Sequence, residues 1–171
     1  MEEAVKSFHP LLPKDTIIRA VNELIDFFGA NPSDGLVEYE SIIKAGKERF
    51  AALDVGFSMD IFVKWLKFFD VNKDNKWSRA EILTMYGAIC LFAAIFSEKD
   101  EYRRFSYIDH LFRTFDRDKK GYLSGESMEF FIDCIACEMS ISKEDARLLI
   151  DTNADNTIDI EEFRDVFDEL I

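Results

Sequence analysis

Oxygen-bearing side chains recur at alternate positions in residues 151–162, a strongly acidic stretch. Alternate positions of a tight loop can aim their oxygens at one point, and a final glutamate can offer both oxygens of its carboxylate. A Ca²⁺ ion takes six to eight oxygen ligands at about 2.3 to 2.6 Å, which this set can supply. The stretch therefore predicts a calcium loop with these ligands: Asp151, Asn153, Asp155, the backbone carbonyl of Thr157, Asp159 directly or through water, and Glu162. The alternative, an acidic solvated turn, would not require this regular spacing.

Residues 70–81 repeat the same spacing. The ligands predicted there are Asp70, Asn72, Asp74, the backbone carbonyl of Lys76, Ser78 through a water, and Glu81. This loop has three ligand carboxylates against four in residues 151–162, so we expect it to bind Ca²⁺ more weakly. Ser78 and Glu81 also form an S-x-x-E capping box, which predicts that a helix starts at the end of the loop.

A third stretch, residues 30–41, has the outline of such a loop without its ligands. Gly35 and Val37 stand at positions six and eight, where the turn and the contact with a neighbouring loop are expected. Asp34 and Glu38 are the only carboxylates in ligand positions. We interpret the stretch as a degenerate loop that binds no ion; an ordinary helix-turn-helix connection is the alternative.

Residues 116–127 are a fourth such stretch, with Gly121 and Leu123 at positions six and eight. Lys120 stands at position five and Ser127 at position twelve. A cation among the ligands and the loss of the bidentate carboxylate predict that this loop does not bind Ca²⁺.

The four stretches form an internal repeat that resembles the EF-hand superfamily, from about residue 15 to residue 171. Both intact loops depart from the family pattern at position six, where Asn75 and Asn156 replace the usual glycine. Glycine is usual there because the turn needs a positive φ, and asparagine is the next most tolerant residue.

The resemblance implies an all-α fold of two pairs of helix-loop-helix units. We expect an N-terminal arm over residues 1–14, a first pair over residues 15–97 and a second pair over residues 98–171. The residues at position eight should join the loops of each pair by a short antiparallel bridge, with Val37 against Trp77 and Leu123 against Ile158.

The composition predicts a soluble, cytoplasmic protein. The formal net charge of -13 argues against nucleic acid or an anionic membrane surface as the direct partner. The longest uncharged run, residues 82–96, is shorter than the roughly 20 residues of a membrane span, so we interpret it as a buried helix. The N-terminal residues lack a basic region followed by an apolar run, and no direct membrane insertion is expected.

Cys134 and Cys137 form a C-x-x-C motif inside a helical pattern of apolar residues. The motif alone would suggest redox or metal chemistry. Its place in a helix favours packed thiols instead, and three cysteines are too few for a disulfide framework.

The sequence favours a calcium-binding protein that is not an enzyme. His9 and His110 are isolated, and no catalytic or phosphate-binding motif is present. The resemblance implies a calcium sensor in which Ca²⁺ opens an apolar groove for an amphipathic helix of a target protein. The two loops that are expected to bind no ion, residues 30–41 and 116–127, are called the silent loops, and their presence fits such a regulator. The alternative is a cytosolic calcium buffer of the sarcoplasmic type, favoured by 17 Phe against five Met, because adaptable sensor grooves are rich in Met. The family's photoproteins resemble the chain in fold only.

The loops predict a stoichiometry of two Ca²⁺ per chain, because only residues 70–81 and 151–162 hold acidic ligands at positions one, five and twelve. Calorimetric titration of the full chain measures this number. Three or four ions of similar affinity would show that the degenerate loops also bind.

Overall fold

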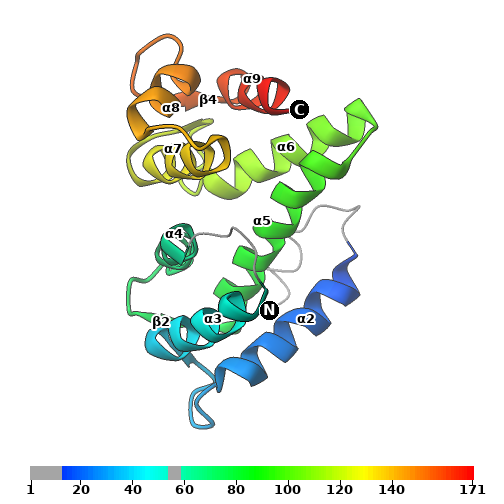
Figure 1. The fold of residues 1–171 in the computed structure, drawn as a ribbon, viewed down its shortest axis with the longest axis vertical. Helices are drawn as coiled ribbons and strands as arrows, with labels where there is room; N and C mark the ends of the chain where they lie inside the picture. Colours follow the sequence, from blue (N-terminus) through cyan, green and yellow to red (C-terminus); the bar gives the residue numbers. More distant parts are fainter. Residues whose placement is uncertain (1–12, 54–58) are drawn as a thin grey trace. The chain divides into compact units, whose positions relative to one another are not determined.

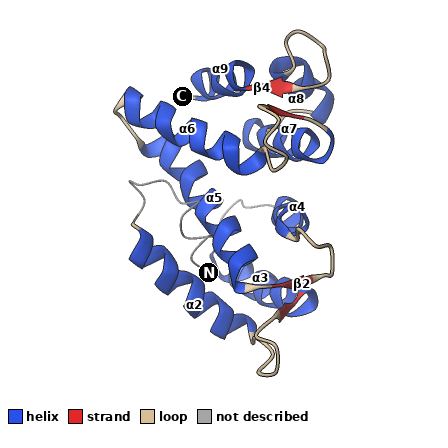
Figure 2. Ribbon diagram, turned by 180° about the vertical axis from the view of Figure 1, so that it is seen from behind, coloured by secondary structure: helices blue, strands red, loops and turns tan. Residues whose placement is uncertain are grey.

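The computed structural model describes residues 13–53 and 59–171, so the predicted N-terminal arm lies outside the described residues up to residue 12. Within this part of the chain, eight helices and four two-residue strands give the all-α fold that the sequence predicts (Figure 1). The helices are α2 (Lys14–Phe28), α3 (Tyr39–Leu53), α4 (Met59–Phe69), α5 (Arg79–Ser97), α6 (Glu101–Phe115), α7 (Gly125–Met139), α8 (Lys143–Ile150) and α9 (Ile160–Leu170). The strands, red in Figure 2, are β1 (Val37–Glu38), β2 (Lys76–Trp77), β3 (Tyr122–Leu123) and β4 (Ile158–Asp159).

The chain divides into two compact units, one ending at Gly87 and the other starting at Ala88. The division falls inside α5. One strand pair, β1 with β2, lies in the first unit, and the other, β3 with β4, lies in the second. The boundary that the sequence suggests, after residue 97, coincides with the end of α5 and stays a prediction.

Two strands join the loops of the first unit. Val37 in β1 lies opposite Trp77 in β2 in an antiparallel register, and both side chains are fully buried. This pairing confirms the predicted bridge. The ring of Tyr39, the first residue of α3, stacks on Trp77 with ring centroids 5.5 Å apart, so the bridge is continuous with the core.

A face of α4 supplies much of the first unit's core. Its buried side chains recur at helical spacing and are at most 8% exposed: Ile61, Phe62, Trp65, Leu66, Phe68 and Phe69. The helix ends at Phe69, so the first residue of the second loop follows directly on a buried aromatic side chain.

The core of the second unit is a cluster of phenylalanine rings contributed by three helices. Phe131 of α7 and Phe163 of α9 stack with ring centroids 4.2 Å apart, and Phe115 of α6 packs edge-on against Phe163 at 6.2 Å. In the strand pair of this unit, Leu123 lies opposite Ile158 as predicted, and both are fully buried. The paired loops and the aromatic core are therefore parts of one packed body.

Helix α5 is long and apolar enough to cross a membrane by length and composition, the single such helix in the described part of the chain. The core helix of a soluble protein meets the same criterion. Several of its apolar side chains are at most 5% exposed: Ile82, Leu83, Met85, Ala88, Leu91 and Ile95. Only 39% of its apolar window is buried, so the buried helix expected from the sequence is confirmed for one part of its surface.

The C-x-x-C motif lies within α7, as its apolar spacing predicts. Cys134 is buried, but Cys137 is exposed, and neither forms a disulfide within the described residues. The prediction of two packed thiols is therefore wrong for Cys137. One turn of helix carries the two residues to different environments, because only the face that includes Cys134 packs against the core.

We predict that Ca²⁺ changes the fluorescence of Trp77, and that Val37→Gly removes most of this response. The indole lies in the bridge that joins the two loops, and glycine removes the side chain opposite it. The measurement uses a Trp65→Phe background, so that Trp77 is the remaining indole. A response that survives Val37→Gly unchanged would show that the bridge does not couple the loops.

Candidate metal centre

The loop of residues 151–162 folds around its first carboxylate. Asp151 follows the last residue of α8 and is 7% exposed. Its two oxygens accept the backbone N–H groups of Asp155 and Asn156, each at 3.1 Å. Asn156 has a φ of 62°, the left-handed conformation that position six requires. Asparagine thus makes the turn for which the family uses glycine.

The last carboxylate of the loop folds back to its start. Glu162 is 6% exposed, and its Oε1 accepts the N–H groups of Thr152 at 3.1 Å and Asn153 at 3.4 Å. Its Oε2 accepts the N–H of Asp159 at 3.2 Å, while the Asp159 carboxylate accepts the N–H of Glu162 at 2.9 Å. This capping box starts α9 and holds Glu162 across the mouth of the loop.

The middle ligands of this loop are also ordered. Asn153 Oδ1 accepts the N–H of Asp155 at 2.9 Å. The hydroxyl of Thr157 donates to Asp155 at 2.7 Å and its N–H donates at 2.8 Å, and these bonds lower the pKa of the Asp155 carboxyl. Asp155 is therefore ionised at neutral pH, the form that a cation needs.

The loop of residues 70–81 has the same frame. Asp70 is 5% exposed and accepts the N–H groups of Asp74 at 3.2 Å and Asn75 at 3.0 Å. Asn75 has a φ of 59°, so it makes the same turn as its counterpart in the other loop. Asn72 donates its amide to Asp74 at 2.8 Å, which places positions three and five side by side.

Glu81 closes this loop through the predicted capping box. Its Oε2 accepts the N–H and the hydroxyl of Ser78, each at 2.8 Å, and Ser78 Oγ accepts the N–H of Glu81 at 3.3 Å. Its Oε1 reaches back to the N–H of Val71 at 3.2 Å. Glu81 is half-buried whereas Glu162 is buried, and the weaker binding expected at this loop stays a prediction.

The donor chemistry of both loops fits a hard cation. Asp70, Asp151 and Glu162 are buried, and within residues 13–53 and 59–171 no ion pair joins any of them to a basic side chain. Backbone N–H groups satisfy their oxygens but leave their charge uncompensated, and buried charges are normally paired or coordinate metals. Asp116 of residues 116–127 is buried in the same way, but only the two intact loops add carboxylates at positions five and twelve, so their predicted ligand residues would hold Ca²⁺.

The described residues contain no group of three or more His, Cys, Asp or Glu side chains gathered as a metal site.

The loop of residues 116–127 keeps this frame without the ligands. Asp116 accepts the N–H groups of Lys120 at 3.0 Å and Gly121 at 2.8 Å, as the first residue of each intact loop does. The Lys120 ammonium pairs with Asp118 at 2.8 Å, which raises the pKa of Lys120 and lowers the pKa of Asp118. Ser127 donates its hydroxyl to the Phe115 carbonyl at 2.9 Å, so position twelve is tied to α6 and does not reach the loop.

The loop of residues 30–41 is organised by its own short contacts. Gly35 has a φ of 70° and donates its N–H to the Asn31 carbonyl at 2.8 Å. Glu38 pairs with the Lys76 ammonium at 2.9 Å across the strand pair, and this contact raises the pKa of Lys76. The strand pairing favours a degenerate loop over an ordinary helix-turn-helix connection.

Sequence reasoning missed the role of Thr152. Its hydroxyl donates to Glu162 Oε1 at 3.1 Å, in addition to its N–H. Position two has no ligand role in the spacing rule. Only the folded loop brings this hydroxyl to the carboxylate ten residues later.

The fold and the loops define a class of all-α protein built from helix-loop-helix units with oxygen-lined cation sites. The family model described as EF hand matches residues 108–126 and residues 149–167. The chain therefore belongs to the EF-hand superfamily, whose domains bind calcium. A search of curated proteins found no match.

Replacing Glu162 by Gln should weaken Ca²⁺ binding at residues 151–162 by at least about tenfold. The change removes one charge and one oxygen ligand, and an interaction with a charged group is worth about 1.5 kcal/mol or more. Glutamine still serves in a capping box, so α9 should keep its start. Calcium titration calorimetry measures both sites.

The matched control is Glu81→Gln, which should weaken only the site in residues 70–81. An unchanged affinity at residues 151–162 in the Glu162→Gln protein would contradict the assignment of Glu162 as the ligand that closes the loop.

Proposed function

We propose that this EF-hand protein is a cytoplasmic calcium sensor that binds two Ca²⁺ ions and acts on a protein partner. The observation that carries the proposal is the pair of buried carboxylates, Asp151 and Glu162, that have no basic partner among the described residues. Bound Ca²⁺ would supply the positive charge that these groups lack. EF-hand proteins are typically non-enzymatic, and the proposal assigns no catalysis to the chain.

The position of these two residues links binding to helix geometry. Asp151 directly follows α8, and Glu162 lies in the first turn of α9. A shift of Glu162 toward the loop centre must move Phe163, which stacks on Phe131 of α7 at 4.2 Å. Ion binding in the loop would therefore reach the packing of the core through adjacent residues of one helix.

The silent loops support a regulatory role. Leu123 and Ile158 join the silent loop of the second unit to its intact loop, and Val37 and Trp77 do so in the first unit. A rearrangement of the intact loop would therefore also move the neighbouring loop and its helices. This arrangement lets one ion act on four helices.

A calcium buffer is the second candidate, favoured by the aromatic core of the second unit. Phe115, Phe131 and Phe163 are fully buried and in mutual contact. Stiff aromatic rings adapt less readily than methionine to a new partner surface. In this case Ca²⁺ would bind without opening the unit.

A titration with a hydrophobic fluorescent probe separates the two candidates. A sensor should bind more probe when Ca²⁺ is added, because opening exposes core surface, and the double variant Glu81→Gln, Glu162→Gln should lose this rise at the same Ca²⁺ concentration. Calorimetry on the same samples confirms that wild-type protein is loaded. Full loading without any rise in probe binding would reject the sensor and favour the buffer.

A further inference from the structure

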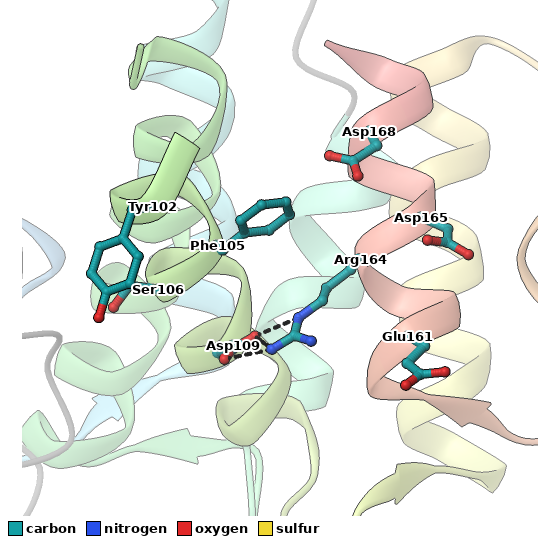
Figure 3. Close-up of a pocket in the computed structure, with 8 residues that line it drawn as sticks. All are labelled: Tyr102, Phe105, Ser106, Asp109, Glu161, Arg164, Asp165 and Asp168. Carbon is teal, nitrogen blue, oxygen red and sulfur yellow. Dashed lines mark hydrogen bonds and ion pairs between the residues drawn. The ribbon is translucent and has the colours of Figure 1, made fainter. Parts of the chain in front are cut away.

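A cleft of about 630 Å³ lies between α6 and α9 in the second unit, and it begins beside the last residues of the calcium loop (Figure 3). Helix α6 contributes one wall and α9 the other. The lining residues are Tyr102, Phe105, Ser106 and Asp109 from α6, and Glu161, Arg164, Asp165 and Asp168 from α9. None of these belongs to the predicted ligand set.

Arg164 is the single basic residue of this lining, and its charge is already compensated. Its Nε and one terminal nitrogen donate to the two carboxylate oxygens of Asp109, each at 2.8 Å. Figure 3 shows this two-pronged contact crossing from α9 to α6. The pair bridges the two walls of the cleft and contributes no net charge to it.

Three exposed carboxylates follow one another along α9 beside this pair: Glu161, Asp165 and Asp168. They are spaced four and three residues apart, so they share one side of the helix. In the part of the chain that the structure describes, their side chains make no hydrogen bond or ion pair. Since Asp109 and Arg164 cancel, the cleft keeps three uncompensated negative charges.

The opposite wall is aromatic. Tyr102 is 85% exposed, and Phe105 one turn later is half-buried. A cleft with aromatic rings on one wall and carboxylates on the other suits a guanidinium group, which is planar, stacks on rings and donates two parallel hydrogen bonds to a carboxylate. An ammonium group lacks this planar geometry.

We propose that this cleft binds a helical segment of a protein partner through arginine side chains that meet Glu161, Asp165 and Asp168 and stack on Tyr102. The proposal rests on the partner-binding function proposed above and names the partner's chemistry. The three carboxylates extend over about 10 Å of α9, which arginines at the same spacing on another helix can match. The net charge of -13 disfavours a second copy of this chain and polyanions such as nucleic acid as occupants.

The test uses the full chain and a fluorescein-labelled helical peptide of alanine and leucine with arginines at positions i, i+4 and i+7. Fluorescence anisotropy should show binding, and the triple variant Glu161→Gln, Asp165→Asn, Asp168→Asn should bind at least about tenfold more weakly. A peptide with lysine at the three positions should also bind more weakly. Tyr102→Ala, at a fully accessible side chain, should reduce affinity for the arginine peptide severalfold.

The matched control variant is Glu138→Gln, Glu144→Gln, Glu169→Gln, which removes the same charge from exposed positions of the second unit outside the cleft lining. It should bind the peptide within about twofold of wild type, and helical circular dichroism confirms that both triple variants fold. Equal weakening by the two triple variants, or no peptide binding by wild type, would overturn the proposal.

Calcium dependence of peptide binding tests the sensor function separately. Helix α6 leads into the loop of residues 116–127, and α9 begins at the end of the loop of residues 151–162. A sensor should therefore bind the peptide differently with Ca²⁺ and with chelator. Binding that depends on the three carboxylates and is equal in both conditions would support the cleft and reject the sensor. Peptide binding that the cleft substitutions do not change would reject the cleft as the binding site. The probe titration would then still decide whether the protein is a sensor.

Discussion

The fold around each intact loop depends on buried carboxylates whose charge no side chain among residues 13–53 and 59–171 compensates through an ion pair. Asp151 and Glu162 are almost completely removed from water, yet the groups that satisfy them are backbone N–H donors. Such donors replace the hydrogen bonds of water without cancelling charge, so desolvation remains costly. The loop keeps these residues buried because α8 and α9 need to pack their apolar faces immediately before and after them. This conflict between packing and charge is what a cation resolves.

The silent loops differ from the intact loops in their ion pairs. In residues 116–127 the exposed Asp118 pairs with the Lys120 ammonium, and in residues 30–41 the exposed Glu38 pairs with Lys76 of the neighbouring intact loop. These pairs are largely exposed and contribute little to stability by themselves. The backbone frame persists because Asp116 still receives two N–H groups and because each silent strand pairs with an intact one. Loop shape and ion binding are thus separable properties of the same repeat.

A predicted calcium ligand and a residue of the aromatic core are adjacent in the sequence, which connects the loop directly to the core. Glu162 and Phe163 are neighbours on α9, one facing the loop and the other stacked within the aromatic cluster. On the other side of the same helix, Glu161, Arg164, Asp165 and Asp168 line the cleft. One short helix therefore joins the cation loop, the core and an acidic surface.

The sequence by itself determined the loops and their pairing. Ligand spacing, the positive φ of Asn75 and Asn156, the capping box at Ser78 and Glu81, and the buried residues at position eight are local properties that the structure reproduces. Only the tertiary structure decided the contacts between distant segments. Arg164 meets Asp109, and Cys137 remains exposed while Cys134 is buried. The physical reason is that periodicity tells which residues share a face, whereas the choice of partner depends on how packed helices bring separate faces together.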